Sequence, residues 1–129
     1  MQKGLKLWHE YVEAGDPALL PAMFTEDCVF ISPVVHTPQR GRDITVLYLS
    51  GAMYVLGNGF RYLKEIVTDT HAALEFECQV DDIVVNGIDI LTFSEDGLIS
   101  EFKVMIRPLQ AVNKVHAKMG EMLGSLKSQ

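Results

Sequence analysis

Asp89 is the residue of this chain best placed to do chemistry. It lies in the middle of the apolar segment 83–94, and Leu91 and Phe93 follow it on the same face of the predicted strand. A carboxylate among apolar neighbours is costly unless it is paired, hydrogen-bonded or protonated, and desolvation raises its pKa. We therefore expect Asp89 to point into an internal pocket. The alternative is a structural ion pair, for which the candidate cations are Arg42, Lys103 and Arg107.

Ser32 is the second residue with possible chemistry. It shares a face of the predicted strand with Cys28 and Phe30, so we expect it to point toward the same interior. A serine nucleophile needs a histidine base beside it, and His36 follows in a predicted loop. The alternative is that Ser32 is a hydrogen-bonding residue or merely a small one.

The composition limits the classes of partner. The chain has 129 residues, a formal net charge of −6 and a pI near 5.1, whereas nucleic-acid binding needs a basic surface. No apolar run approaches the roughly 20 residues of a membrane span. Charged residues interrupt the apolar stretches of the N-terminus, unlike in a signal peptide. We therefore expect a cytoplasmic protein that binds neither nucleic acid nor membrane.

Neither a metal nor a cofactor is expected. The four histidines are scattered, and no cysteine lies near them at metal-ligand spacing. The turn Gly57-Asn58-Gly59 follows a predicted helix instead of preceding one, so it is no phosphate-binding loop. Cys28 and Cys78 lie far apart on strand-like segments. They could form one disulfide, but we favour two buried free thiols in a reducing compartment.

The elements that must position these residues follow from periodicity and turn residues. Helical spacing and capping residues predict helices over 3–14, 17–24, 41–57 and 108–126. Alternation and β-branched residues predict strands over 27–33, 60–68, 71–80, 83–94 and 99–107, with a loop over 34–40. Helices grouped beside a mostly antiparallel meander indicate an α+β fold, in a single domain over 1–129. A twisted sheet of long strands curls, so its concave face needs filling.

Three of these elements should line the concave side. Phe102, Val104 and Ile106 share one face of the last strand, where they form either a cavity wall or ordinary core packing. Tyr48 lies on the apolar stripe of helix 41–57 and can line a pocket with its hydroxyl as a polar handle. The final helix should bury one stripe, made of Leu109, Val112, His116, Met119 and Leu123.

Several short motifs, in this order and spacing, resemble one known family. They are Ala14-Gly15-Asp16 after a helix, the segment 23–30, Ser32-Pro33-Val34 with Pro38 and Gly41 after it, and the hairpin formed by 87–93 and 96–99. Together they resemble the SnoaL-like polyketide cyclases and ketosteroid isomerases of the nuclear transport factor 2-like superfamily, over nearly the whole chain. The resemblance implies a cone-shaped α+β barrel with a deep apolar pocket, in a protein that is frequently dimeric. Superfamily members include isomerases, cyclases, epoxide hydrolases, dehydratases and non-catalytic binders.

The resemblance also implies roles for three residues. Asp89 matches an aspartate that stays protonated in the isomerases and donates a hydrogen bond to a developing oxyanion. Ser32 stands where the isomerases have their general-base aspartate, and a serine cannot hold a proton taken from carbon near neutral pH. Trp8 falls where they place a tyrosine of the oxyanion hole. Its indole N–H can donate a hydrogen bond but no transferable proton, and the alternative is a plain core residue.

These observations favour a pocket protein that binds a small hydrophobic molecule, with Trp8, Ser32, Tyr48, Asp89, Phe102, Val104 and Ile106 as its lining residues. One alternative is a small isomerase, cyclase or hydrolase that uses Asp89 as an acid, a base or an oxyanion donor. The other is an interaction module. The segment 83–94 is apolar on both faces, so we expect a homodimer through the convex face of the sheet.

Overall fold

A computed structural model describes residues 2–127 of the chain. Along this range the elements are α1 (Lys3–Ala14), β1 (Phe24–Ile31), β2 (Gln39–Arg40), α2 (Arg42–Leu56), β3 (Arg61–Val67), β4 (His71–Val80), β5 (Ile83–Phe93), β6 (Ile99–Arg107) and α3 (Leu109–Lys127). The strands form one sheet in the order β2-β1-β6-β5-β4-β3. Neighbouring strands are antiparallel except β1 and β6, which are parallel. The predicted α+β fold is confirmed.

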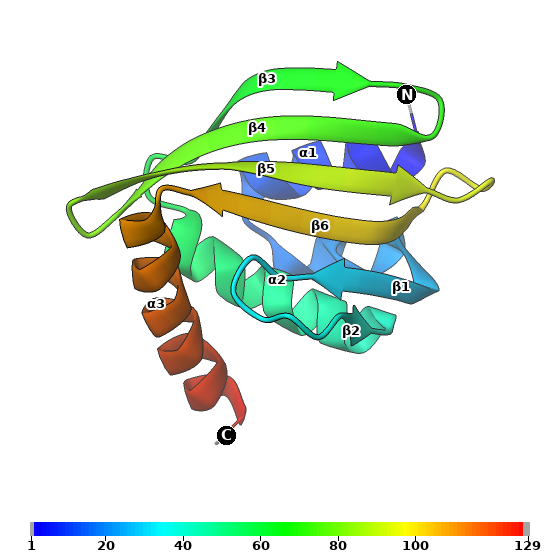
Figure 1. Ribbon diagram of the computed structural model, residues 1–129. Coiled ribbons are helices and arrows are strands. Elements are labelled where there is room, and N and C mark those ends of the chain that lie inside the picture. Colours follow the sequence, from blue (N-terminus) through cyan, green and yellow to red (C-terminus); the bar gives the residue numbers. More distant parts are fainter. Residues whose placement is uncertain (1, 128–129) are drawn as a thin grey trace.

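The sheet is strongly curved but not closed. Helices α1 and α2 lie against its concave side, and α3 leaves the end of β6 and passes beside α2 (Figure 1). The two ends of the sheet, β2 and β3, do not pair with each other, so the closed barrel implied by the family resemblance is wrong for this chain. Side chains from the helices fill the concave side instead of a closing strand pair.

Three predicted segments differ clearly from the observed elements in their ends or their type. The predicted helix 17–24 consists of two 3-10 turns, Pro17–Leu19 and Pro21–Met23. Asp16 does cap the first, since its carboxylate accepts a hydrogen bond from the Ala18 amide at 3.0 Å. Pro21 has no N–H to continue a helical ladder, which explains the break. The strand predicted over 27–33 runs over Phe24–Ile31, and the predicted loop 34–40 ends in the two-residue strand β2.

The buried face of α3 also differs from the prediction. Ala111, Val115 and Met119 are buried, whereas Leu109 is 74% exposed and His116 is exposed as well. Both stripes are compatible with helical spacing and share Met119. The sheet and α2 select the stripe that contains the smaller Ala111, because α3 packs directly against β5, β6 and α2.

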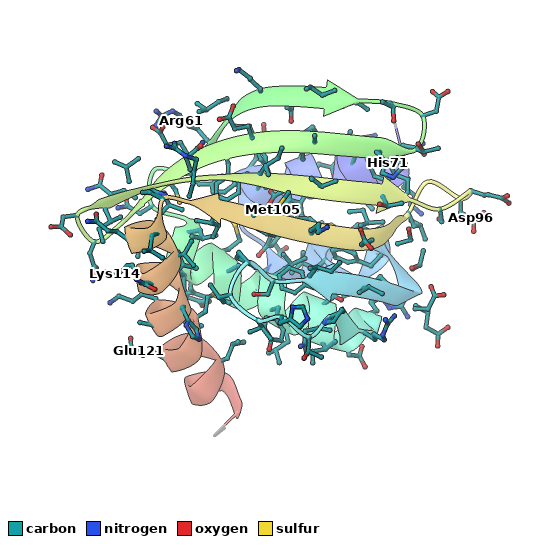
Figure 2. The ribbon with its side chains drawn as sticks, viewed as in Figure 1. Arg61, His71, Asp96, Met105, Lys114 and Glu121 are labelled. Carbon is teal, nitrogen blue, oxygen red and sulfur yellow. The ribbon has the colours of Figure 1, made fainter. Side chains whose placement is uncertain are left out.

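The strands show the predicted alternation. In β4, Leu74, Phe76, Cys78 and Val80 are buried, and in β6 Phe102 and Val104 are buried while Met105 is 45% exposed. Figure 2 shows Met105 on the face of the sheet opposite α1 and α2. Cys28 and Cys78 are both buried and free, as favoured from the sequence. No helix within residues 2–127 is long and apolar enough to cross a membrane.

Candidate functional site

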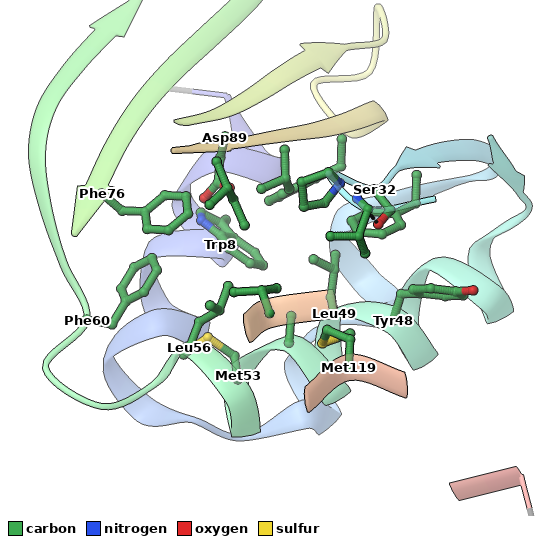
Figure 3. A pocket seen from close by; sticks show the side chains of 18 residues that line it. Trp8, Ser32, Tyr48, Leu49, Met53, Leu56, Phe60, Phe76, Asp89 and Met119 are labelled. Carbon is green, nitrogen blue, oxygen red and sulfur yellow. Dashed lines mark hydrogen bonds between the residues drawn. The ribbon is translucent and has the colours of Figure 1, made fainter. Parts of the chain in front are cut away.

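A cavity lies between the concave face of the sheet and helices α1, α2 and α3 (Figure 3). Its volume is about 50 Å³, counted as the space that the centre of a water-sized sphere can occupy. The wall is almost entirely apolar, and Asp89 is its single charged residue among the described ones. The lining residues are Trp8, Phe30, Ser32, Pro33, Val34, Tyr48, Leu49, Ala52, Met53, Leu56, Phe60, Phe76, Asp89, Phe102, Val104, Ile106, Val115 and Met119.

Asp89 is only 4% exposed, and its side chain is held by a tyrosine. Tyr62 Oη donates a hydrogen bond to Asp89 Oδ2 over 2.6 Å. No ion pair with Asp89 forms among the described residues, so the alternative of a structural pair with Arg42, Lys103 or Arg107 is wrong. Asp89 Oδ1 likewise has no hydrogen-bond partner in this part of the chain. One carboxyl oxygen is therefore committed to Tyr62 and the other is free for a contact in the cavity.

Trp8 extends this contact into a chain of three side chains. Its indole Nε1–H donates a hydrogen bond to Tyr62 Oη over 2.7 Å. The Trp8 ring is 3% exposed and packs edge-on against Phe102, with the ring centroids 4.7 Å apart. Trp8 is thus a large core residue, as one prediction had it, and its indole N–H is donated to Tyr62, not toward an oxyanion in the cavity.

Burial controls the acidity of Asp89. Loss of solvent raises the pKa of its carboxyl to about 7, and the hydrogen bond from Tyr62 opposes this rise. Burial also raises the pKa of the Tyr62 hydroxyl well above its usual value, and the neighbouring Asp89 carboxylate adds to that rise. Near neutral pH, Asp89 is therefore the titrating member of the pair and Tyr62 keeps its proton.

Tyr62 lies on the concave face of β3, directly before a β-bulge. Tyr62 pairs with Phe76 and Lys64 pairs with Glu75, which leaves Leu63 as the extra residue on β3. The extra residue shifts the alternation, so that both Tyr62 and Glu65 point toward α1. Glu65 Oε1 contacts His9 Nε2 there at 2.6 Å, which fixes α1 beside the bulged strand.

Aromatic rings form two groups in and beside the cavity wall. Phe60 stacks on Phe76 with centroids 5.0 Å apart and meets Tyr62 edge-on at 5.1 Å. A side chain at Gly87 would collide with the Phe76 ring and with the backbone oxygen of Met105, so glycine is needed for the ring to lie across β5. The second group of rings consists of Trp8, Phe30, Tyr48 and Phe102.

Ser32 lines the cavity without the partner that nucleophilic chemistry requires. It follows the end of β1, and its Oγ accepts a hydrogen bond from the Val34 amide at 3.1 Å. His36 is exposed and makes no hydrogen bond with Ser32. The hydroxyl therefore stabilises a local turn, which is the hydrogen-bonding alternative raised from the sequence.

The other predicted lining residues also border the cavity. Tyr48 packs against Phe30 with ring centroids 5.4 Å apart, and its hydroxyl points away from Asp89 (Figure 3). Phe102, Val104 and Ile106 lie along the wall made by β6. The structure thus brings all seven predicted residues to one cavity. Two of them, Trp8 and Asp89, are connected by hydrogen bonds through Tyr62.

Sequence reasoning missed Tyr62, which contacts both of those residues. The bulge disturbs the alternation of β3, so the inner face of that strand could not be recognised from the pattern. One signal was available: a buried carboxyl needs a donor, and a tyrosine in a neighbouring segment can supply one. Metal-binding clusters of three or more His, Cys, Asp or Glu are absent from the described part of the chain.

The curved, helix-filled sheet with a buried cavity defines the nuclear transport factor 2-like class of folds. The family model of the SnoaL-like domain matches residues 5–102, and this chain belongs to that family.

Three solved structures show the extent of the similarity. A steroid Δ-isomerase from Pseudomonas aeruginosa is 30% identical, with a TM-score of 0.93 over 98% of this chain and 93% of that one. An uncharacterised protein with a cystatin-like fold from Silicibacter pomeroyi is 31% identical, with a TM-score of 0.88 over 94% of this chain and 85% of that one. The epoxide hydrolase/cyclase-like enzyme SalBIII, described in pyran ring formation in salinomycin, shares the fold at 20% identity and a TM-score of 0.65, over 82% and 92% of the two chains. No curated protein matches the sequence.

Proposed function

We propose that this chain binds a small, mostly apolar molecule in its cavity, with Asp89 as the main polar contact. The observation that carries the proposal is the contrast between an apolar wall and one buried carboxyl with an unpartnered oxygen. Binding sites commonly combine an apolar wall with a few polar groups of this kind. We place this function in the cytoplasm, which is compatible with two buried free thiols.

The binding test uses 1-indanone, a small ketone with an apolar body, and a variant that fills the cavity. Ala52 lines the cavity on α2, so Ala52→Leu should weaken binding of 1-indanone in calorimetric titrations. Tyr54 lies on the same helix and is 79% exposed, so Tyr54→Leu is the matched control and should bind like the wild type. Equal binding by all three proteins, or binding by none, would count against a ligand in this cavity.

An enzyme that transfers a proton through Asp89 is the second candidate. It is supported by a carboxyl whose pKa lies at about 7, close to the value that suits acid–base catalysis at neutral pH. The similarity to a protein described as a steroid Δ-isomerase points the same way. The described lining residues hold no second carboxylate, and the Ser32 hydroxyl is engaged in a turn. Because no second acid or base lines the cavity in the described part of the chain, we favour ligand binding over efficient catalysis.

We also propose that two copies associate through the convex face of the sheet. Ile66, Val84 and Met105 are 66%, 55% and 45% exposed there, beside the half-buried Ile88. Charges of both signs border these residues, with Lys64 and Arg107 next to Glu75. A two-fold contact pairs a surface with itself, and a surface with mixed charges can complement its own copy.

A further inference from the structure

We propose that α3 is a movable wall of the cavity, held closed by the ion pairs that Lys114 and Lys118 form with Asp81 at the turn between β4 and β5. The inference rests on the proposed binding function and adds how a ligand gains entry and what limits its affinity. It follows from the small volume of the cavity, from the unequal fastening of its walls, and from the position of the two lysines on α3.

The closed cavity is too small for an organic ligand. Its volume is about 50 Å³, whereas an engineered apolar cavity that takes up benzene has roughly 150 Å³. Protein interiors are close-packed, so the surrounding structure offers no spare room. A ligand of the size of 1-indanone therefore needs one of the walls to move.

Three walls of the cavity are fastened by hydrogen bonds. The strand β5 is paired along its length with β4 and β6. Helix α1 is joined to the sheet through Trp8, Tyr62 and Asp89. Helix α2 is anchored where it begins, because the Gly41 amide donates to the Cys28 carbonyl on β1 at 2.7 Å. None of these walls can be displaced without breaking such bonds.

Helix α3 is fastened differently. It contributes Val115 and Met119 to the cavity wall, on the same apolar face as the buried Ala111. Apart from Lys114 and Lys118, no side chain among residues 109–123 forms a hydrogen bond or ion pair with another element of the described chain. Apolar contacts are non-directional, so α3 can shift with a smaller loss than a hydrogen-bonded wall.

The contact between α3 and α2 is made by flexible side chains. A Cβ at Gly51 of α2 would lie 3.4 to 3.7 Å from Met122, Leu123 and Met119 of α3. Methionine is unbranched and adapts to a changed gap more easily than other apolar residues. This interface therefore tolerates a small displacement of α3.

The two lysines lie one helical turn apart and reach the same carboxylate, beside the start of α3 (Figure 1). Lys114 Nζ and Lys118 Nζ lie 3.2 Å and 3.6 Å from Asp81 Oδ2. The hydrogen bond from Lys114 and the charge of Lys118 lower the pKa of Asp81, so its carboxylate is ionised at neutral pH. The Asp81 side chain is 50% exposed, and exposed ion pairs are weak. These ion pairs can therefore break and re-form readily.

Ion pairs that keep α3 closed also limit the affinity for a ligand. When a ligand binds only the open form, its apparent affinity falls in proportion to the fraction of molecules that are open. Loss of two exposed ion pairs should raise this fraction by about threefold. Access to the cavity and affinity for 1-indanone should therefore both increase when Asp81 loses its charge.

Asp81→Asn tests the ion pairs, and Asp82→Asn is its matched control. Asp81 has a φ of 55°, and asparagine tolerates this left-handed conformation, so the turn is kept. Asp82 is the exposed next residue of the same turn and forms no ion pair within the described chain. Each variant removes one negative charge, so a difference between them reports the ion pairs and not the net charge.

Acrylamide quenching of Trp8 fluorescence measures the opening without a ligand. Trp8 is the single tryptophan, lines the cavity and is 3% exposed, and acrylamide is uncharged. The quenching constant should be about threefold larger in Asp81→Asn than in the wild type or in Asp82→Asn. Sodium chloride at about 0.5 M should increase quenching in the wild type by screening the ion pairs, and should leave Asp81→Asn unchanged. Equal quenching in all three proteins, or an equal rise in both variants, would overturn the proposal.

Calorimetric titration with 1-indanone separates this inference from the proposed function. Asp81→Asn should bind about threefold more tightly than the wild type and Asp82→Asn. Equal affinities would overturn the role of α3 yet leave the cavity as a binding site, with the loop 32–38 as the wall that has to yield. Binding by none of the three would refute the proposed function itself, and the quenching of Trp8 would still test the movement of α3.

Discussion

Tyr62 Oη and Asp89 Oδ2 lie 2.6 Å apart although their strands are not neighbours, because β4 runs between β3 and β5. The bond spans the concave face and joins the edge strand β3 to the middle of the sheet. Trp8 adds a link from the same tyrosine to α1. One hydroxyl therefore connects three elements that are separate in the chain.

Tyr62→Phe should destabilise the protein by about 1–3 kcal/mol, because it leaves the Trp8 N–H and an Asp89 oxygen buried without partners. Urea denaturation at neutral pH measures this loss. Tyr54→Phe removes a hydroxyl from a side chain that is 79% exposed and should change little. Similar free energies of unfolding for the two variants would contradict a structural role for the Tyr62 hydroxyl.

Asp89→Asn should remove a pH dependence of stability. The folded-state pKa of about 7 lies above the unfolded value of about 3.9, so the unfolded chain loses this proton first as pH rises. Asp89 therefore contributes fully to stability below about pH 4, and the contribution is lost as pH rises to about 7, by roughly 4 kcal/mol in all. Denaturation of both proteins across this range should show the asparagine variant gaining relative to the wild type as pH increases. If the free energies of unfolding of the two proteins changed in parallel with pH, Asp89 would be ionised in the folded protein across this range.

Wild-type protein should have no steroid isomerase activity of ordinary efficiency, since Ser32 cannot serve as a base for a proton on carbon. An assay with a standard unsaturated ketosteroid tests this. Ser32→Asp places a carboxylate on the cavity wall and is the variant in which activity should first appear. High turnover by the wild type would show that the base lies elsewhere.

Met105→Lys should weaken self-association, because it places a charge in the middle of the convex face, where Met105 is 45% exposed. Light scattering at tens of micromolar should report a dimer for the wild type and a larger monomer fraction for the variant. Leu109→Lys, at a position that is 74% exposed on α3, is the control. A monomeric wild type at that concentration would refute the dimer.

Gly87→Ala should cost about 1–3 kcal/mol, the usual range for overpacking, since the added methyl group meets the Phe76 ring and the Met105 backbone oxygen. Relief requires Phe76 to turn and the backbone at Met105 to shift, and the turn of Phe76 alters the cavity wall. The variant should therefore also lose affinity for 1-indanone, measured by calorimetry. Unchanged stability and affinity would show that β5 can shift away from Phe76 at little cost.

The regular parts of the fold could be predicted from the sequence because their signals are local. The strands His71–Val80 and Ile99–Arg107 have the predicted bounds, since clean alternation and tight turns define them. The buried stripe of α3 could not be chosen, because two stripes fit the helical period and only the packing against β5 and β6 decides between them.

Within the site, the sequence pattern identified Asp89 but not its hydrogen-bond partner Tyr62. An isolated carboxylate in an apolar strand is visible in the sequence, whereas the bulge at Leu63 depends on how β3 pairs with β4. Thr45 was missed on α2 for a similar reason: it is fully buried, and its hydroxyl oxygen accepts a hydrogen bond from Cys28 Sγ of β1 at 3.4 Å. A hydrophobicity pattern cannot predict that a polar residue is buried when its hydrogen-bond partner lies in a distant part of the chain.

The bulge at Leu63 gives β3 an unusual tolerance toward changes of length. Deleting one residue from an ordinary strand turns every later side chain to the opposite face. Here Leu63 is the unpaired insertion, so its deletion would restore a continuous ladder in which Tyr62 still opposes Phe76 and Lys64 still opposes Glu75. A relative that is one residue shorter at this point can therefore keep the same inward-facing tyrosine and glutamate. In comparisons of such relatives, a gap at Leu63 should be interpreted as the loss of a bend and not as the loss of the site.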